Sequence, residues 1–196
     1  MQLFAYCFTI ITNAVVTTVK CQTQARKNYL KWEECFMKIA LIAAERSKDP
    51  KTQVGACIVD DDHRILGVGY NGFPKTEHKD NDGGIYSWNS DEKHDYVCHA
   101  ERNAIAHSNG NLKGATMYVT LHPCNECAKE IIQKEFKRVI YIDEKDSPFI
   151  KLEAAKKMFR HSKLGEAVQY HKLIADKYGV NFKTSLMTKV AFSIAK

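Results

Sequence analysis

The chain has 196 residues, 44% of them hydrophobic and 27% charged, which is the balance of one globular domain that forms its core without disulfides. Seven cysteines, an odd number without framework spacing, favour a reducing compartment, and we expect a cytoplasmic protein. The net charge of +6 suits an anionic substrate or a plain solvated surface. The sequence shows no Lys/Arg block with interleaved aromatic residues, so nucleic-acid binding is not expected.

The N-terminal residues differ in character from the rest of the chain. Residues 3–16 are apolar, yet no Lys or Arg precedes them, and the run is too short to cross a bilayer. A polar stretch, residues 20–28, follows it. We therefore expect an N-terminal leader of unknown role, or an upstream start codon assigned in error, at 1–28, a single domain at 29–190 and a C-terminal tail at 191–196.

The first part of this domain predicts a helix followed by a hairpin. Apolar residues recur at helical spacing from Trp32 to Arg46, and Asp49-Pro50 ends the pattern. Two apolar strands, 53–59 and 64–70, flank the polar turn at 60–63.

The next stretch, residues 74–96, is polar and has no period. Because structureless loops of this length are uncommon in compact domains, we expect a functional flap or an insertion there. After it we expect a helix at 99–107, a strand at 116–121, a helix at 123–136 with Pro123 in its first turn, a strand at 138–142, helices at 150–160 and 164–178, and a final strand near 181–185.

The order of these elements predicts the fold class. A helix, a hairpin and then alternating helices and strands indicate an α/β protein with a mixed five-stranded sheet and helices on both faces, which is a three-layer α/β/α arrangement. In such a fold the segments around residues 99 and 124 both lie at helix N-termini, where they can converge.

Two short segments carry the strongest chemical signal: CHAE at 98–101 and HPCNEC at 122–127. His99, Cys124 and Cys127 offer one imidazole and two thiolates, a set that suits Zn²⁺. Structural zinc sites normally have four protein ligands, whereas catalytic sites keep the fourth position for water. The positive end of a helix dipole also favours thiolates over neutral thiols. The pattern therefore predicts a catalytic zinc site.

Glu101 follows the imidazole ligand by two residues and is the candidate proton shuttle. Zinc lowers the pKa of bound water towards about 7, and a nearby carboxylate can move protons during attack on a ring carbon. His-x-Glu with Pro-Cys-x-x-Cys is typical of zinc nucleobase deaminases. Two alternatives stay open: a redox Cys pair, and a structural zinc site with His122 as fourth ligand.

Two further segments are candidate substrate contacts. Asn71 follows the second strand of the hairpin, and its amide can donate and accept hydrogen bonds to a ribose hydroxyl or a pyrimidine edge. Asn-Gly is equally typical of a plain turn. Ser47 and Lys48, after the first helix, can meet a phosphate, although Lys near a helix C-terminus is common in any case.

At these residues the chain resembles the deoxycytidylate (dCMP) deaminases of the cytidine deaminase superfamily. The metal motif is common to the superfamily, whereas the Ser-Lys-Asp-Pro and Gly-Tyr-Asn-Gly segments resemble the branch acting on nucleoside monophosphates. The resemblance covers residues 30–142 and is carried by RSKDP at 46–50, QVGA at 53–56, GYNG at 69–72, YVCHAE at 96–101 and PCNECAK at 123–129.

The resemblance implies a cytidine-deaminase-like fold and a cytosolic homohexamer that converts dCMP to dUMP for thymidylate synthesis. It implies that Asn71 and Ser47 contact the nucleotide, and that dCTP and dTTP act as effectors near Gly69, Tyr70 and Gly72. The chain departs from the family pattern at Lys75–His78, Arg102, His122 and Lys163–Lys172.

Two other functions remain open at this stage. One is a zinc deaminase acting on dCTP, on cytidine or deoxycytidine, or on adenosine in transfer RNA. The other is a non-catalytic, deaminase-like binding protein, although a purely structural zinc site has no use for Glu101.

Overall fold

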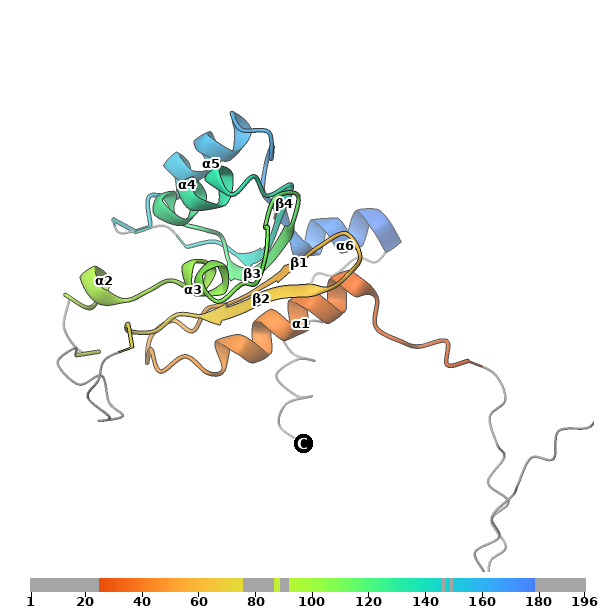
Figure 1. The fold of residues 1–196 in the computed structure, drawn as a ribbon, viewed down its shortest axis with the longest axis horizontal. Coiled ribbons are helices and arrows are strands. Elements are labelled where there is room, and N and C mark those ends of the chain that lie inside the picture. The colour runs from red at the N-terminus through yellow and green to blue at the C-terminus, as the bar shows by residue number, and fades with distance from the viewer. Residues whose placement is uncertain (1–24, 76–86, 89–91, 146, 149, 179–196) are drawn as a thin grey trace, which may run out of the picture. The chain divides into compact units, whose positions relative to one another are not determined.

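The computed structural model describes residues 25–75, 87–88, 92–145, 147–148 and 150–178 (Figure 1). The chain divides into two compact units, Met1–Leu30 and Lys31–Lys196. Every helix and strand named below belongs to the second unit. No helix within these described ranges is long and apolar enough to cross a membrane.

A five-stranded sheet lies at the centre of the second unit, with the strand order β2-β1-β3-β4-β5. β1 pairs antiparallel with β2 and with β3, whereas β4 runs parallel to both of its neighbours. The sheet is therefore mixed, as predicted. Its strands are β1 (Gly55–Val59), β2 (Ile65–Tyr70), β3 (Thr116–Leu121), β4 (Arg138–Asp143) and β5 (Val168–Gln169).

Helices cover both faces of this sheet and give the predicted three-layer α/β/α arrangement (Figure 1). On one face α3, α4 and α5 pack over a core that includes Ile58, Met117 and Phe159. On the other face α1 and α6 pack over a second core, which includes Phe36 of α1 and Ile140 of β4. The helices are α1 (Trp32–Ala44), α2 (Lys93–Tyr96), α3 (Ala100–Ala106), α4 (Asn125–Gln133), α5 (Leu152–Arg160) and α6 (Tyr170–Tyr178).

Strand alternation explains why both faces are apolar. Met117 and Val119 of β3 belong to the core under α3, α4 and α5, whereas Tyr118 between them belongs to the core under α1. Gly55 lets α1 lie close to the sheet, because a Cβ at this position would overlap the backbone carbonyl of Ala40. The close packing of α1 on β1 thus helps to set the position of the loop that follows α1.

Two helix predictions need correction near the chemical motifs. α4 begins at Asn125 with Cys124 as its N-cap, so Pro123 precedes the helix and does not occupy its first turn. The sulfur of Cys124 accepts the backbone N–H of Cys127, a side-chain cap that the sequence pattern did not reveal. In addition, the short helix α2 lies within the polar stretch 74–96 that was expected to lack regular structure.

The predicted helix at 164–178 is also wrong in its first part. Gly165 has a φ of +74°, which is outside the helical range, and Val168–Gln169 pairs with β4 as the fifth strand. α6 begins only at Tyr170. Pairing with a distant strand outweighed the local helical period, and the strand predicted near 181–185 lies outside the described residues.

Candidate metal centre and nucleotide pocket

Three side chains with metal-binding atoms converge at the N-termini of α3 and α4. His99 is the residue before α3, and Cys124 and Cys127 stand at the start of α4. His99 Nδ1 lies 3.3 Å from Cys124 Sγ and 3.4 Å from Cys127 Sγ, and all three atoms lie within 4.8 Å of one another. Zinc bonds of about 2.0–2.3 Å in a tetrahedron place two ligand atoms about 3.5 Å apart. The three predicted ligands therefore fit one zinc ion.

His122, the alternative fourth ligand, is not in this cluster of the described residues. Its Nδ1 lies 2.9 Å from the Pro123 carbonyl oxygen, so Nδ1–H donates to that oxygen. The ring packs edge-on against Tyr141 and tilted against Phe159, and burial lowers its pKa, which favours the neutral imidazole. His122 thus serves as a framework residue beneath the end of β3 and also reaches the wall of the pocket described below.

The two thiols of the cluster differ in acidity. A hydrogen bond from the Cys127 thiol, followed by one from the His99 ring, lowers the pKa of Cys124 to about 4. The pKa of Cys127 is raised because its thiol donates to Cys124 and is buried. These opposite shifts favour a thiolate at Cys124 and a thiol at Cys127, and a zinc ion held here would bind both as thiolates.

Glu101 lies in the first turn of α3, close to the ligand cluster but not part of it. Its residue is only 4% exposed, and burial raises the pKa of its carboxyl group, although the charge of His99 opposes this effect. A carboxyl group that binds a proton more readily than usual is suited to accept and return one during a reaction.

Glu101, His99 and Cys124 all line one cavity of about 280 Å³. This volume lies just below the range of about 300–1,000 Å³ that is usual for small-molecule sites. The rest of the wall comes from the loop after α1, the position after β2, α2, α3, the end of β3 and the loop after β4, and includes Asp49, Lys51, Thr52, Asn71, Lys93, His94, Leu121, His122, Lys145 and Ile150. The cavity therefore joins metal ligands and a buried acid to several polar side chains.

Asn71 lines this cavity and is 5% exposed. Its Oδ1 accepts the backbone N–H of Val54 at 2.8 Å, and its Nδ2 donates to the carbonyl of Thr52 at 2.9 Å. These two bonds determine which side of the amide is oxygen. Because an amide oxygen has two lone pairs and the amide nitrogen two hydrogens, each atom keeps capacity for one further partner in the cavity.

Ser47 and Lys48 do not line the cavity. The hydroxyl of Ser47 donates to the backbone carbonyl of Asn71 at 2.9 Å and accepts the N–H of Asp49 at 3.3 Å. Ser47 thus joins the loop after α1 to the end of β2, whereas the exposed Lys48 lies outside the pocket.

Gly69, Tyr70 and Gly72 also lie outside the cavity wall. A Cβ at Gly69 would overlap the backbone of α3, so this glycine allows α3 to pack on β2. The Tyr70 ring is partly exposed, and its backbone carbonyl accepts a hydrogen bond from Asn103. Gly72 pairs with Cys98 in an isolated antiparallel bridge, which holds the segment leading to His99. These three positions therefore support the site's architecture.

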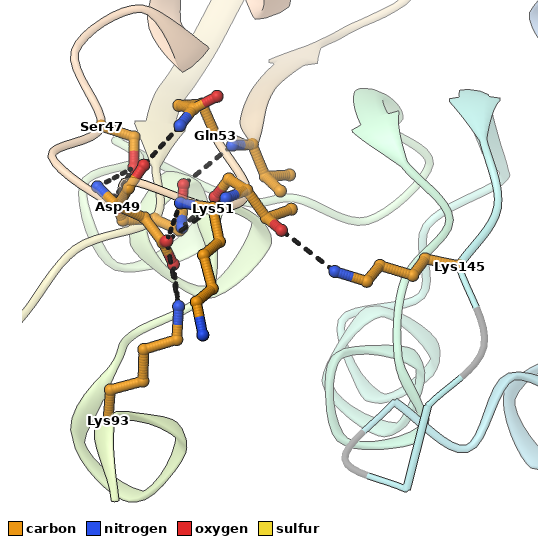
Figure 2. Close-up of polar contacts among 9 residues, drawn as sticks. Ser47, Asp49, Lys51, Gln53, Lys93 and Lys145 are labelled. Atoms are coloured by element: carbon orange, nitrogen blue, oxygen red, sulfur yellow. Dashed lines mark hydrogen bonds and ion pairs between the residues drawn. The ribbon is translucent and has the colours of Figure 1, made fainter. Parts of the chain in front are cut away.

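An ion pair between Asp49 and Lys93, which the sequence did not predict, lies in the wall of the cavity. Both side chains are buried, at 5% and 6% exposure, and Lys93 Nζ lies 3.0 and 2.9 Å from the two carboxylate oxygens (Figure 2). The partners are 44 positions apart, and Lys93 lies in a stretch without periodicity, so no local pattern could connect them.

Comparison with known proteins agrees with this geometry. Residues 30–143 match the family model described as "Cytidine and deoxycytidylate deaminase zinc-binding region". The chain is 41% identical over 170 residues to the deoxycytidylate deaminase of Mus musculus, covering 82% of this chain and 93% of that protein. It is 44% identical over 151 residues to the enzyme of Homo sapiens, covering 74% and 82%. The dCMP deaminase of cyanophage S-TIM5 in complex with dCMP and dUMP superposes with a TM-score of 0.54 at 28% identity, over 72% of this chain and 99% of that one.

Proposed function

Because the chain belongs to the cytidine and deoxycytidylate deaminase family, we propose that it is a zinc-dependent enzyme that hydrolyses dCMP to dUMP and ammonia. One observation carries this proposal: the buried Glu101 shares a single cavity with the His99 and Cys124 ligand side chains. The similarity to proteins named deoxycytidylate deaminase, over most of their length, supports dCMP as the substrate.

In this proposal His99, Cys124 and Cys127 hold the zinc ion, and Glu101 moves the protons. Zinc in such a site supplies a hydroxide at neutral pH, since the pKa of bound water falls to about 7. Glu101 takes one proton of the attacking water and delivers it to the ring nitrogen, then takes the proton of the new hydroxyl group on the ring carbon and gives it to the leaving amine as the C–N bond breaks. One water and one dCMP thus give one dUMP and one ammonia, with no net change at Glu101.

Asn71 orients the nucleotide in this proposal. Its amide is held by Val54 and Thr52 and has one donor and one acceptor left for the substrate, which suits a ribose hydroxyl or the edge of the cytosine ring. Ser47 supports this contact indirectly, because it holds the backbone carbonyl of Asn71.

The proposal extends to regulation, assembly and location on the strength of the family resemblance. It includes dCTP and dTTP as effectors near Gly69, Tyr70 and Gly72, a homohexamer, and a cytoplasmic location. Tyr70 is partly exposed and lies outside the cavity, which supports a contact between Tyr70 and a ligand other than the substrate.

Ammonia release from purified protein tests the function directly. We expect dCMP to be the best substrate among dCMP, dCTP, deoxycytidine and a transfer RNA. A higher kcat/KM for any of the other three would contradict the proposed substrate, and no release from all four would contradict the proposed activity.

A further inference from the structure

Three lysines from three different segments line the cavity: Lys51, Lys93 and Lys145. Lys51 lies in the loop after α1, Lys93 begins α2, and Lys145 follows β4. Figure 2 shows the side chains of Lys93 and Lys145 reaching the loop after α1 from different elements. Their positive charges lie on the same cavity wall but have different surroundings.

The charge of Lys93 is compensated within the protein. Its ammonium group binds both oxygens of Asp49, and the two side chains are buried together. The Asp49 carboxylate also accepts the backbone N–H groups of Lys51 at 2.9 Å and Thr52 at 3.2 Å. Asp49 and Lys93 therefore tie the loop after α1 to α2 and leave little net charge for a ligand.

Lys51 and Lys145 have no carboxylate partner in the part of the chain that the structure describes. Lys145 Nζ donates to Thr52 Oγ1 at 3.1 Å, so the loop after β4 reaches the loop that carries Lys51 (Figure 2). Both lysines are exposed, whereas Glu101 and Cys124 of the same cavity are buried. The cavity therefore has a buried end with the metal ligands and an exposed rim with two uncompensated positive charges.

We infer that Lys51 and Lys145 bind the 5′-phosphate of the nucleotide and so determine the preference for a monophosphate over a nucleoside. This inference deepens the proposed function and rests on it. With the reacting base at the buried end, the phosphate lies towards the exposed rim, where two ammonium groups donate charge-assisted hydrogen bonds to it. Asp49 and Lys93 act as positioning residues, because they hold the backbone from which Lys51 extends. Lys48, the phosphate contact expected from the sequence, lies outside the cavity.

The test compares kcat/KM for dCMP and for deoxycytidine in Lys51→Met and Lys145→Met. Methionine keeps an apolar stem of similar length and removes the charge. We expect each variant to lose roughly 10- to 100-fold with dCMP, mainly in KM, and less than about threefold with deoxycytidine. Lys134→Met is the matched control, since Lys134 is exposed at the far end of α4 from Cys124, and its dCMP preference should match the parent.

The inference is overturned if Lys51→Met and Lys145→Met both keep the parent's ratio of the two kcat/KM values, or if both substrates lose equally. It is also overturned if Lys48→Met changes the ratio and the other two variants do not. These outcomes leave the proposed function intact, provided that the parent prefers dCMP. A parent protein that does not prefer dCMP instead contradicts the proposed function itself. Thermal unfolding of each variant shows whether a loss reflects misfolding.

Discussion

Replacing Lys93 by Met is a direct test of the buried ion pair between Asp49 and Lys93 in the wall of the pocket. The variant leaves the Asp49 carboxylate, 5% exposed, without its cation. Removing one partner of a buried pair costs about 3–5 kcal/mol. Because Asp49 keeps the N–H groups of Lys51 and Thr52, we expect the lower value, about 3 kcal/mol. In a domain of this size each kcal/mol lowers Tm by about 2–4 °C, so Tm should fall by about 6–12 °C.

The assay is thermal unfolding of the parent, Lys93→Met, Asp49→Asn and the double variant at neutral pH. Asn at position 49 keeps an oxygen that accepts the two backbone N–H groups but carries no charge. The double variant should therefore be more stable than Lys93→Met alone, because no unpaired buried charge remains. A Tm for Lys93→Met within about 2 °C of the parent, or strictly additive losses in the double variant, would refute the reasoning.

The same pair predicts a pH dependence. Burial by itself raises the pKa of Asp49, but hydrogen bonds from the Lys51 N–H, the Lys93 ammonium and the Thr52 N–H outweigh it, so the pKa lies below its usual value. The pKa of Asp49 is about 3.9 in the unfolded chain and lower in the folded protein. The ionised Asp49 carboxylate therefore stabilises the fold fully above about pH 3.9, and this stabilisation is lost as the pH falls through the folded-state pKa. Without the Lys93 ammonium the pKa of Asp49 rises. Acid unfolding of Lys93→Met should therefore begin at a higher pH than in the parent, and superimposable acid curves would contradict this.

Three further predictions concern the metal ligand Cys124, the proton shuttle Glu101 and residues 1–28. Cys124→Ser should reduce bound zinc from one per chain, measured by metal analysis, and retention of zinc with full activity would exclude Cys124 as a ligand. Glu101→Gln should keep zinc and fold but lose on the order of 10²–10⁴-fold in deamination rate, and a rate within about tenfold of the parent would remove Glu101 from its role. A chain that begins at Asn28 should deaminate dCMP at the parental rate, because every chemical motif lies beyond Trp32. A folded but inactive truncated chain would show that the leader belongs to the site.

The sequence alone was sufficient to predict two features: the three residues that form the metal-ligand cluster, and the three-layer arrangement of the fold. His99, Cys124 and Cys127 are recognisable because metal chemistry restricts both residue type and spacing, and the structure brings their ligand atoms together. The order of most helices and strands along the chain could be anticipated because buried strands such as Thr116–Leu121 are short apolar runs, and the helices between them are amphipathic.

Elements whose position depends on distant partners could not be predicted in this way. Val168–Gln169 has a local pattern that suits a helix, yet it forms the fifth strand because β4 offers it unpaired backbone groups. The start of α4 is a local feature that the sequence pattern also missed: the sulfur of Cys124 caps the helix, so α4 begins at Asn125 and not at Pro123 as expected.

The substrate side of the pocket was decided only by tertiary structure. In the sequence Lys48 and Lys51 are equivalent cations in one loop, and only the fold shows that Lys51 lines the cavity while Lys48 does not. Lys93 is one of many lysines in the sequence, but the fold places it against Asp49 and cancels its charge. Residue type determines which chemistry a side chain can perform, whereas burial and distance determine whether its charge is available to a ligand.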